Sequence, residues 1–251
     1  MENYITRGSV SLWTEIQGHT GPYVLMAAGG PGAASDYLDG LVTLLKDKVR
    51  IIRFDQRACG RSSLDYSCDL QTTLEDLEAI RHFYKIDKWI LLGHSWGANL
   101  CLAYTIQYPQ VCQALIYLSG IGAQRNREWR ESYHENRKKY PDPLPPSKFP
   151  GNDQVNKLGN QSWADYIRRP KLFKDISCIK TRTLIIHGQR DHRPDWPCQQ
   201  LHHLIKDSKF VSIEGAGHCI WTSHGPLLRD HILSFIDPHP IYINHNPIME
   251  L

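Results

Sequence analysis

The sequence lacks the long apolar segments and the charge excess that would place it in a membrane or on a nucleic acid. Among its 251 residues, no apolar run approaches the roughly 18–20 residues that a membrane-spanning helix needs. The formal net charge is only +3, and the Lys and Arg residues are scattered along the chain rather than clustered. We therefore expect neither a membrane nor a nucleic acid as a partner. The composition makes no prediction of the oligomeric state.

Cysteine spacings that suit a disulfide framework or a zinc site are also missing. The seven cysteines include no C-x-x-C pair, so neither structural zinc nor a small disulfide-stapled fold is indicated. Cys101, Cys112 and Cys178 fall in apolar stretches and are expected to be small core residues. Residues 1–4 have neither the basic nor the apolar character of a secretory signal. Together these features predict a cytoplasmic location.

Short apolar runs alternate with amphipathic helical patterns along most of the chain. The runs that fit parallel strands buried on both faces are 23–28, 49–54, 89–92, 114–118 and 183–186. Residues 10–16 alternate in polarity, as a half-buried antiparallel strand does. Helical patterns lie at 37–46, 72–84, 98–108, 198–205 and 227–236. This alternation predicts an α/β fold with a mostly parallel central sheet and helices on both faces.

The alternation breaks between residues 122 and 179. An Arg- and Glu-rich helical pattern at 124–140 is followed by a proline-rich stretch and a polar, Trp-containing segment. This stretch is too long for an ordinary connection and too polar for the core. We expect a single core formed by residues 1–121 and 180–251, with 122–179 inserted as a short cap over the carboxyl edge of the sheet. The tail at 237–251 has no strong periodicity and is given no role.

Residues 93–97, Gly-His-Ser-Trp-Gly, carry the strongest functional signal. They follow the predicted strand at 89–92 and precede the predicted helix at 98–108. A strand, a G-x-S-x-G turn and a helix together form a nucleophile elbow, in which a strained backbone exposes the serine hydroxyl. The two glycines fit because strand and helix come too close there for a Cβ atom. Ser95 is therefore the predicted nucleophile.

A serine hydroxyl needs a base to take its proton, and the base needs a third group to orient it. Asp191 follows the strand predicted at 183–187 and is expected at the carboxyl edge of the sheet. Asp195 is a rival, but Asp191 lies nearer the strand end. His218 ends the loop Glu-Gly-Ala-Gly-His after the next predicted strand, and this placement selects it from 13 histidines.

Two backbone N–H groups are candidates for stabilising the oxyanion that forms during acyl transfer. Trp96 is one, because its amide lies in the first turn of the helix after the nucleophile, where the helix dipole helps. The second is assigned to Gly30, in the loop Ala-Gly-Gly-Pro-Gly after the strand at 23–28. A plain tight turn is the alternative interpretation of that loop.

With Ser95, Asp191 and His218 in this order, the chain resembles an α/β-hydrolase over nearly all of its length outside the cap. Residues 29–32, Gly-Gly-Pro-Gly, resemble the His-Gly-Gly-Pro-Gly loop of the proline iminopeptidases. Residues 55–62, Asp-Gln-Arg-Ala-Cys-Gly-Arg-Ser, resemble that family's Asp-Gln-Arg-Gly-x-Gly-x-Ser signature, and Gly-His-Ser-Trp-Gly matches its nucleophile motif.

The resemblance implies hydrolysis of an N-terminal proline or similar residue from peptides, through an acyl-enzyme and without a metal or organic cofactor. The sequence departs from the family pattern at Ala28, where the family has His, at Ala58, where it has Gly, and in its shorter cap. The Asp-Gln-Arg motif is expected to be scaffold, with Asp55 and Arg57 bracing neighbouring loops through charge-assisted hydrogen bonds.

In this family, acidic residues of the cap bind the free amine of the substrate. Three glutamates fall on one face of the predicted cap helix, at Glu128, Glu131 and Glu135. The aromatic residues available for an apolar wall around a proline ring are Trp129, Tyr133 and Trp163. The arginines interleaved with the glutamates are Arg125, Arg127, Arg130 and Arg137. Because this interleaving favours a solvated, salt-bridged helix, no cap residue is assigned to binding.

The sequence thus predicts a serine hydrolase whose partner is a small molecule or short peptide. A prolyl aminopeptidase acting on small peptides or amides is the preferred interpretation, and a small-molecule carboxylesterase or lactonase is the alternative. A non-catalytic binding protein on a hydrolase scaffold is disfavoured, because all three members of the triad are present. The same residues also permit acyl transfer to an acceptor other than water.

Overall fold

The computed structural model describes residues 1–141 and 143–237, and an eight-stranded sheet runs through the molecule. Its strands are β1 (Glu2–Arg7), β2 (Val10–Gln17), β3 (Tyr23–Ala27), β4 (Arg50–Phe54), β5 (Trp89–His94), β6 (Cys112–Leu118), β7 (Thr183–Gly188) and β8 (Ser208–Ile213). Their order across the sheet is β1-β2-β4-β3-β5-β6-β7-β8. The β1–β2 and β2–β4 pairs are antiparallel, and all other pairs are parallel. The mostly parallel sheet expected from the sequence is confirmed.

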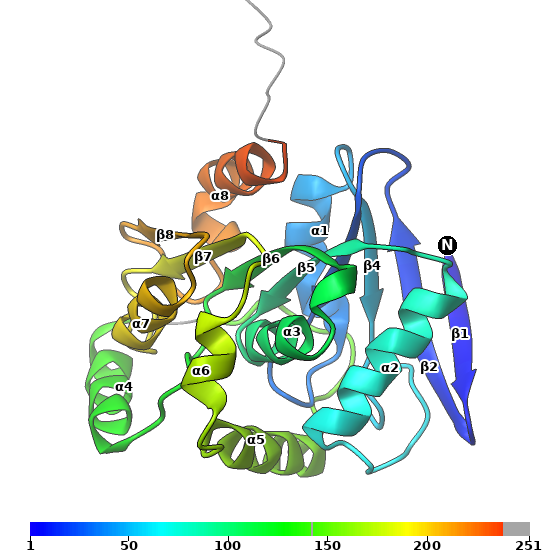
Figure 1. Cartoon of the computed structure of the whole chain (residues 1–251), viewed down its shortest axis with the longest axis horizontal. Helices are drawn as coiled ribbons and strands as arrows, with labels where there is room; N and C mark the ends of the chain where they lie inside the picture. Colours follow the sequence, from blue (N-terminus) through cyan, green and yellow to red (C-terminus); the bar gives the residue numbers. More distant parts are fainter. Residues whose placement is uncertain (142, 238–251) are drawn as a thin grey trace, which may run out of the picture.

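Helices cover both faces of this sheet (Figure 1). They are, with two short 3₁₀ turns, η1 (Ser35–Leu38), α1 (Asp39–Leu45), α2 (Leu70–Phe83), α3 (Trp96–Gln107), η2 (Pro109–Val111), α4 (Arg127–Lys139), α5 (Asp153–Ile167), α6 (Leu172–Ser177), α7 (Trp196–Leu204) and α8 (Trp221–Ile236). Helices α2, α3, α6 and α7 contribute to the apolar cluster on one face. Helices α1 and α8 contribute to the cluster on the other.

The central strands are apolar along their whole length because both of their faces are buried. In β5, Trp89 and Leu91 pack into the cluster of α2 and α3, while Ile90 and Leu92 pack into the cluster of α1 and α8. Successive side chains of a strand point to opposite faces, so a strand covered on both sides needs a continuous apolar run rather than an alternating one. The same strand carries the nucleophile motif at its carboxyl end.

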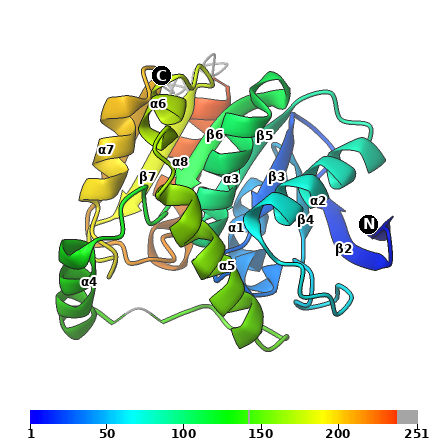
Figure 2. The same ribbon diagram turned by 60° about the horizontal axis from the view of Figure 1, so that its bottom comes forward.

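The segment between β6 and β7 contains α4, α5 and α6 (Figure 2). Helix α6 packs Leu172 and Ile176 into the cluster on the face of α3. Helix α4, by contrast, has Trp129 as its only fully buried residue, in keeping with its Arg- and Glu-rich sequence. No helix in the described ranges is both long and apolar enough to cross a membrane. Residues 238–251 of the tail lie outside the described residues.

Strand β1, helix α8 and Cys178 are among the features that differ from the sequence-based expectations. Strand β1 was not predicted, because it is a sheet edge in which only Ile5 is buried and its sequence is mostly polar. Helix α8 begins before residue 227, at Trp221, with non-helical His224 at a kink two residues before Pro226. Cys178 was wrongly expected in the core: it is exposed and directly follows α6, while Cys101 and Cys112 are buried.

Candidate active site

Ser95 occupies the sharp turn between β5 and α3. Its backbone angles, φ 58° and ψ −121°, lie in a region that non-glycine residues seldom adopt. A Cβ on Gly93 would overlap the backbone of Gly97, and a Cβ on Gly97 would overlap the carbonyl oxygen of Ala27. The two glycines therefore allow strand and helix to approach, and the turn holds Ser95 at the carboxyl edge of the sheet.

The structure brings Asp191 and His218 together. The Asp191 Oδ2 atom lies 2.6 Å from Nδ1 of His218, and both side chains are buried. Asp191 follows β7 and His218 follows β8, so adjacent parallel strands deliver the two groups to the same edge. The rival carboxylate, Asp195, instead accepts a hydrogen bond of 2.9 Å from Gln199 in α7.

Asp191 is held as a carboxylate. Burial alone would raise its pKa, but the charge and hydrogen bond of His218 and the charge of Arg193 outweigh burial and hold the pKa well below its usual range. Both the backbone N–H and the Nη1 atom of Arg193 donate to Asp191 Oδ1, each at 2.9 Å. The two carboxylate oxygens therefore have separate partners, and Oδ2 is directed at the imidazole.

Ser95 and His218 line one cavity of about 390 Å³. Ser95 also lines an adjoining cavity of about 310 Å³, together with Trp96. Gly30 lines both cavities. The amide of the preceding glycine, Gly29, is engaged, because it donates to the Tyr37 hydroxyl at 2.6 Å. The two amides expected to stabilise an oxyanion thus belong to residues that border the space beside Ser95.

A buried chain of hydrogen bonds behind Ser95 was not predicted. The Tyr37 hydroxyl lies 2.9 Å from Nδ1 of His94, and Nε2 of His94 lies 3.2 Å from the carbonyl oxygen of His218. Burial lowers the pKa of His94 far below its usual value, and the nearby His218 lowers it further, so the ring is neutral. A neutral imidazole donates from Nε2 to the carbonyl and accepts at Nδ1 from Tyr37.

This chain links three segments that are distant in sequence: the Gly29–Gly30 loop, the nucleophile turn and the His218 loop. No sequence pattern predicted a role for His94 or for Tyr37. The only available signal was the position of a histidine next to Ser95, in a strand otherwise made of apolar residues.

The Asp-Gln-Arg segment is scaffold, as expected from its charges. Asp55 is fully buried and accepts from the Ser35 amide at 2.8 Å and from Arg61 Nε at 2.7 Å. Arg57 makes a bidentate ion pair with Asp76 of α2, with both N–O distances 2.7 Å. These charge-assisted bonds fix the loop after β4 against the turn before α1 and against α2.

Helices α4 and α5 supply the outer walls of the Ser95–Trp96 cavity. Two of the three aromatic residues considered for an apolar wall, Trp129 and Tyr133, line it, with their rings stacked at 5.3 Å. The third, Trp163, is buried against Tyr166. None of the three cap glutamates is among the lining residues that the structure describes, and Glu131 pairs with Arg127 at 2.6 Å.

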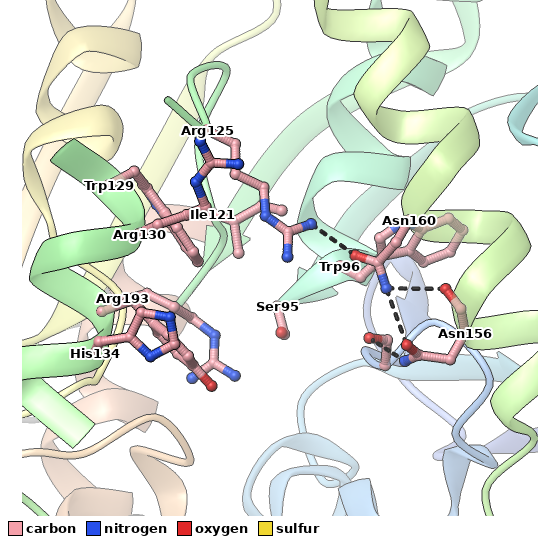
Figure 3. A pocket seen from close by; sticks show the side chains of 12 residues that line it. Ser95, Trp96, Ile121, Arg125, Trp129, Arg130, His134, Asn156, Asn160 and Arg193 are labelled. Carbon is pink, nitrogen blue, oxygen red and sulfur yellow. Dashed lines mark hydrogen bonds between the residues drawn. The ribbon is translucent and has the colours of Figure 1, made fainter. Parts of the chain in front are cut away.

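Arginines line this cavity instead. They are Arg125, Arg130 and Arg193. Figure 3 shows Ser95 between Arg193 and His134 on one side and Asn156 and Asn160 of α5 on the other. The sequence pattern had suggested only a solvated helix for this region. Within residues 1–141 and 143–237, no three His, Cys, Asp or Glu side chains converge to hold a metal ion.

Comparison with known proteins places this chain in a family. Residues 22–150 match the family model of the alpha/beta hydrolase fold. The proline iminopeptidase of Saccharolobus solfataricus is 29% identical over 258 residues, which cover 83% of each chain. The proline iminopeptidase of Neisseria gonorrhoeae is 39% identical over 114 residues, a match that covers 43% of this chain and 36% of that protein.

Solved structures share the fold at low sequence identity. The proline iminopeptidase of Mycobacterium smegmatis superposes with a TM-score of 0.75 at 15% identity, covering 95% of this chain and 98% of the other. An esterase from Exiguobacterium antarcticum superposes with a TM-score of 0.73 at 20% identity, covering 94% and 99%. The chain belongs to the α/β-hydrolase fold family and resembles the proline iminopeptidases within it.

Proposed function

We propose that this chain is a serine hydrolase that works through an acyl-enzyme on Ser95, with His218 as the base and Asp191 orienting it. The observation that carries the proposal is the buried 2.6 Å bond between Asp191 and His218, at the rim of a cavity that His218 and Ser95 share. The strained backbone of Ser95 supports the same role, because such strain is typical of a nucleophile elbow.

In this mechanism His218 donates from Nδ1 to Asp191, which leaves Nε2 to take the proton of the Ser95 hydroxyl. The serine oxygen then bonds to the substrate carbonyl carbon, and the amides of Gly30 and Trp96 stabilise the oxyanion. When the tetrahedral intermediate collapses, the bond to the leaving group breaks and His218 returns the proton to it. Water, activated by the same base, then releases the acyl group and regenerates Ser95.

Two substrate classes suit this machinery. The first is an N-terminal residue of small peptides or amides, by analogy with the relatives named proline iminopeptidase. The second is a small carboxylic ester or lactone, which one observation favours: the Ser95–Trp96 cavity is lined by arginines and by no described carboxylate that would pair with a protonated amine. We propose that residues 122–179 form a cap over the site, since α4 and α5 of this segment form walls of the Ser95–Trp96 cavity. The content of seven free cysteines supports a reducing cytoplasm as its location.

The test compares the rates of hydrolysis of prolyl and alanyl anilides, their N-blocked versions and simple acyl esters, with Ser95→Ala as the control. Hydrolysis that disappears in Ser95→Ala is expected, because the loss of a nucleophile removes about a million-fold in rate in a serine hydrolase. Cleavage of free-amine anilides but not of blocked ones would support the aminopeptidase, and a preference for esters would support the second class. A Ser95→Ala protein with the wild-type rate would contradict the proposal.

A further inference from the structure

Three arginines lie around Ser95, and the proposed mechanism gives no role to two of them, Arg125 and Arg130. Arg125 lies just before α4, Arg130 lies within it, and Arg193 lies in the loop after β7, yet all three line the same cavity of about 310 Å³. The other lining residues that the structure describes include no aspartate or glutamate. An amine-binding pocket needs the opposite charge.

The arginines are close enough to repel one another. Burial lowers the pKa of Arg125, and the charges of Arg130 and Arg193 lower it further. Arg125 donates to the amide oxygen of Asn160 at 2.9 Å and lies over the ring of Trp129, 5.3 Å from its centroid, so neither neighbour carries a negative charge. Among the described residues, no carboxylate lies within ion-pair distance of Arg125 or Arg130, whereas Arg127 of the same helix pairs with Glu131. Arg125 and Arg130 are neighbouring positive charges with no carboxylate partner among the described residues, and their repulsion costs free energy that a bound anion would recover.

Arg193 connects this charge to the catalytic residues. Its guanidinium pairs with Asp191 at 2.9 Å and also borders both cavities beside Ser95. Figure 3 shows Ser95 between Arg193 on one side and Asn160 on the other, with the guanidinium of Arg125 bonded to Asn160. Because the arginines and Ser95 line the same cavity, a substrate whose carbonyl lies at Ser95 can place a second group against the arginines.

We infer that the substrate of this site carries an anionic oxygen-bearing group, a carboxylate or a phosphate, which Arg125 and Arg130 bind while Ser95 attacks its ester or amide carbonyl. Guanidinium groups present paired N–H donors that match the oxygens of either anion. Trp129 and Tyr133, whose rings stack on each other in the same wall, give that wall apolar atoms beside which the carbon chain between the two groups can lie. This inference rests on the proposed serine hydrolase and specifies its substrate.

The experiment uses p-nitrophenyl esters matched in length: the neutral pentanoate, the glutarate monoester with a terminal carboxylate, and the 4-phosphonobutanoate. We expect kcat/KM for at least one anionic ester to exceed that for the pentanoate about ten-fold or more, a gain typical of one charge-assisted contact. Whether the glutarate or the phosphonate gains more distinguishes the two anions. In Arg130→Gln, the ratio of anionic to neutral kcat/KM should fall about ten-fold.

Arg127→Gln is the matched control, because it removes the same charge from the same helix at an exposed side chain that does not line the cavity. It should keep the wild-type ratio. Equal or lower kcat/KM for both anionic esters in the wild type would overturn the inference while leaving the serine hydrolase intact. A ratio that falls equally in Arg127→Gln and Arg130→Gln would also overturn it, since only overall charge would then matter.

A binding measurement separates this inference from the proposed function. In Ser95→Ala protein, calorimetry with monomethyl glutarate and 4-phosphonobutanoate should detect binding that weakens about ten-fold on adding Arg130→Gln and persists on adding Arg127→Gln. If neither esters nor anilides are hydrolysed yet this binding is found, the serine hydrolase fails and the anion site stands. If esters are hydrolysed and neither anion binds, the anion site fails.

Discussion

The Tyr37 hydroxyl lies 2.9 Å from Nδ1 of His94, and through this contact it connects the loop of Gly30 with the loop of His218. Tyr37 accepts from the Gly29 amide on one side, and His94 donates to the His218 carbonyl on the other. In the proposed mechanism, neither Tyr37 nor His94 transfers a proton to or from the substrate. They would instead hold Gly30, the proposed oxyanion donor, and His218, the proposed base, in fixed positions relative to Ser95.

Replacing Tyr37 with Phe should therefore lower kcat by about ten-fold or more with a smaller change in KM, because misplaced catalytic groups act mainly in the transition state. The change leaves the Gly29 amide without its acceptor, which should cost about 1–3 kcal/mol of stability. Tyr84→Phe is the control: its hydroxyl contacts Thr14 at 2.9 Å, away from the site, so stability should fall and kcat should not. Equal kcat in both variants would contradict the positioning role.

The neutral state of His94 predicts a pH dependence of stability. The folded protein excludes a proton that unfolded His94 binds below about pH 6.5, so the stability present above that pH is lost as the pH falls. The expected slope from this one residue is about 1.4 kcal/mol per pH unit. Asp191, whose pKa is also lowered, contributes only below about pH 4, where its unfolded form begins to bind a proton.

Urea unfolding between pH 5 and pH 7.5 measures this slope. His94→Gln should be less stable than the wild type at pH 7.5 but should show a shallower slope below pH 6.5. If wild type and His94→Gln have the same slope, His94 is not the group that titrates.

The choice of carboxylate can be tested with two isosteric substitutions. Asp191→Asn should reduce kcat by about ten-thousand-fold, as the loss of an orienting carboxylate favours the wrong imidazole tautomer. Asp195→Asn should remain near the wild-type rate, because Asp195 bonds Gln199 in α7. Steady-state kinetics on any ester that the wild type cleaves decides between them. The reverse order of effects would transfer the orienting role to Asp195.

The tight nucleophile turn predicts that any side chain at Gly93 will strongly destabilise the fold. An added methyl group would overlap backbone atoms of Gly97 and Ala98, which cannot move aside, so Gly93→Ala should cost about 3 kcal/mol or more of stability. At Gly151 the nearest atom to an added Cβ lies 3.9 Å away, so Gly151→Ala should change stability by less than about 1 kcal/mol. Thermal unfolding of the two variants makes the comparison, and a Gly93→Ala protein as stable as Gly151→Ala would exclude the tight approach.

The elements that could be predicted from the sequence are those whose own residues show a clear strand or helix periodicity. Strand β5 and helix α3 flank Gly-His-Ser-Trp-Gly with unmistakable periodicity, and two strand ends point to Asp191 and His218. Strand β1 was missed because an edge strand needs no apolar run: its residues pair with β2 through the backbone while most side chains stay exposed.

The rest depends on contacts between distant residues. Tyr37 and His94 are 57 positions apart, and only the packing of η1 beside β5 brings them together. From the sequence, the arginines of α4 could face either solvent or a cavity. Arg127 is exposed and pairs with Glu131, whereas Arg130 lines the cavity. This difference depends on where α4 lies over the sheet, which local pattern does not predict. Cys178 was misjudged because its apolar neighbours Leu172 and Ile176 are buried, whereas Cys178 itself is exposed just after α6.

The most direct test of the proposed chemistry is covalent labelling of Ser95 by a fluorophosphonate, followed by peptide mass spectrometry. An activated serine displaces fluoride and retains the phosphonyl group, so we expect a single adduct on the peptide that contains Ser95. The rate of labelling should fall at least a hundred-fold in His218→Ala, because the base that removes the hydroxyl proton is gone. Absence of an adduct on Ser95, or labelling that is equally fast without the His218 imidazole, would contradict the triad.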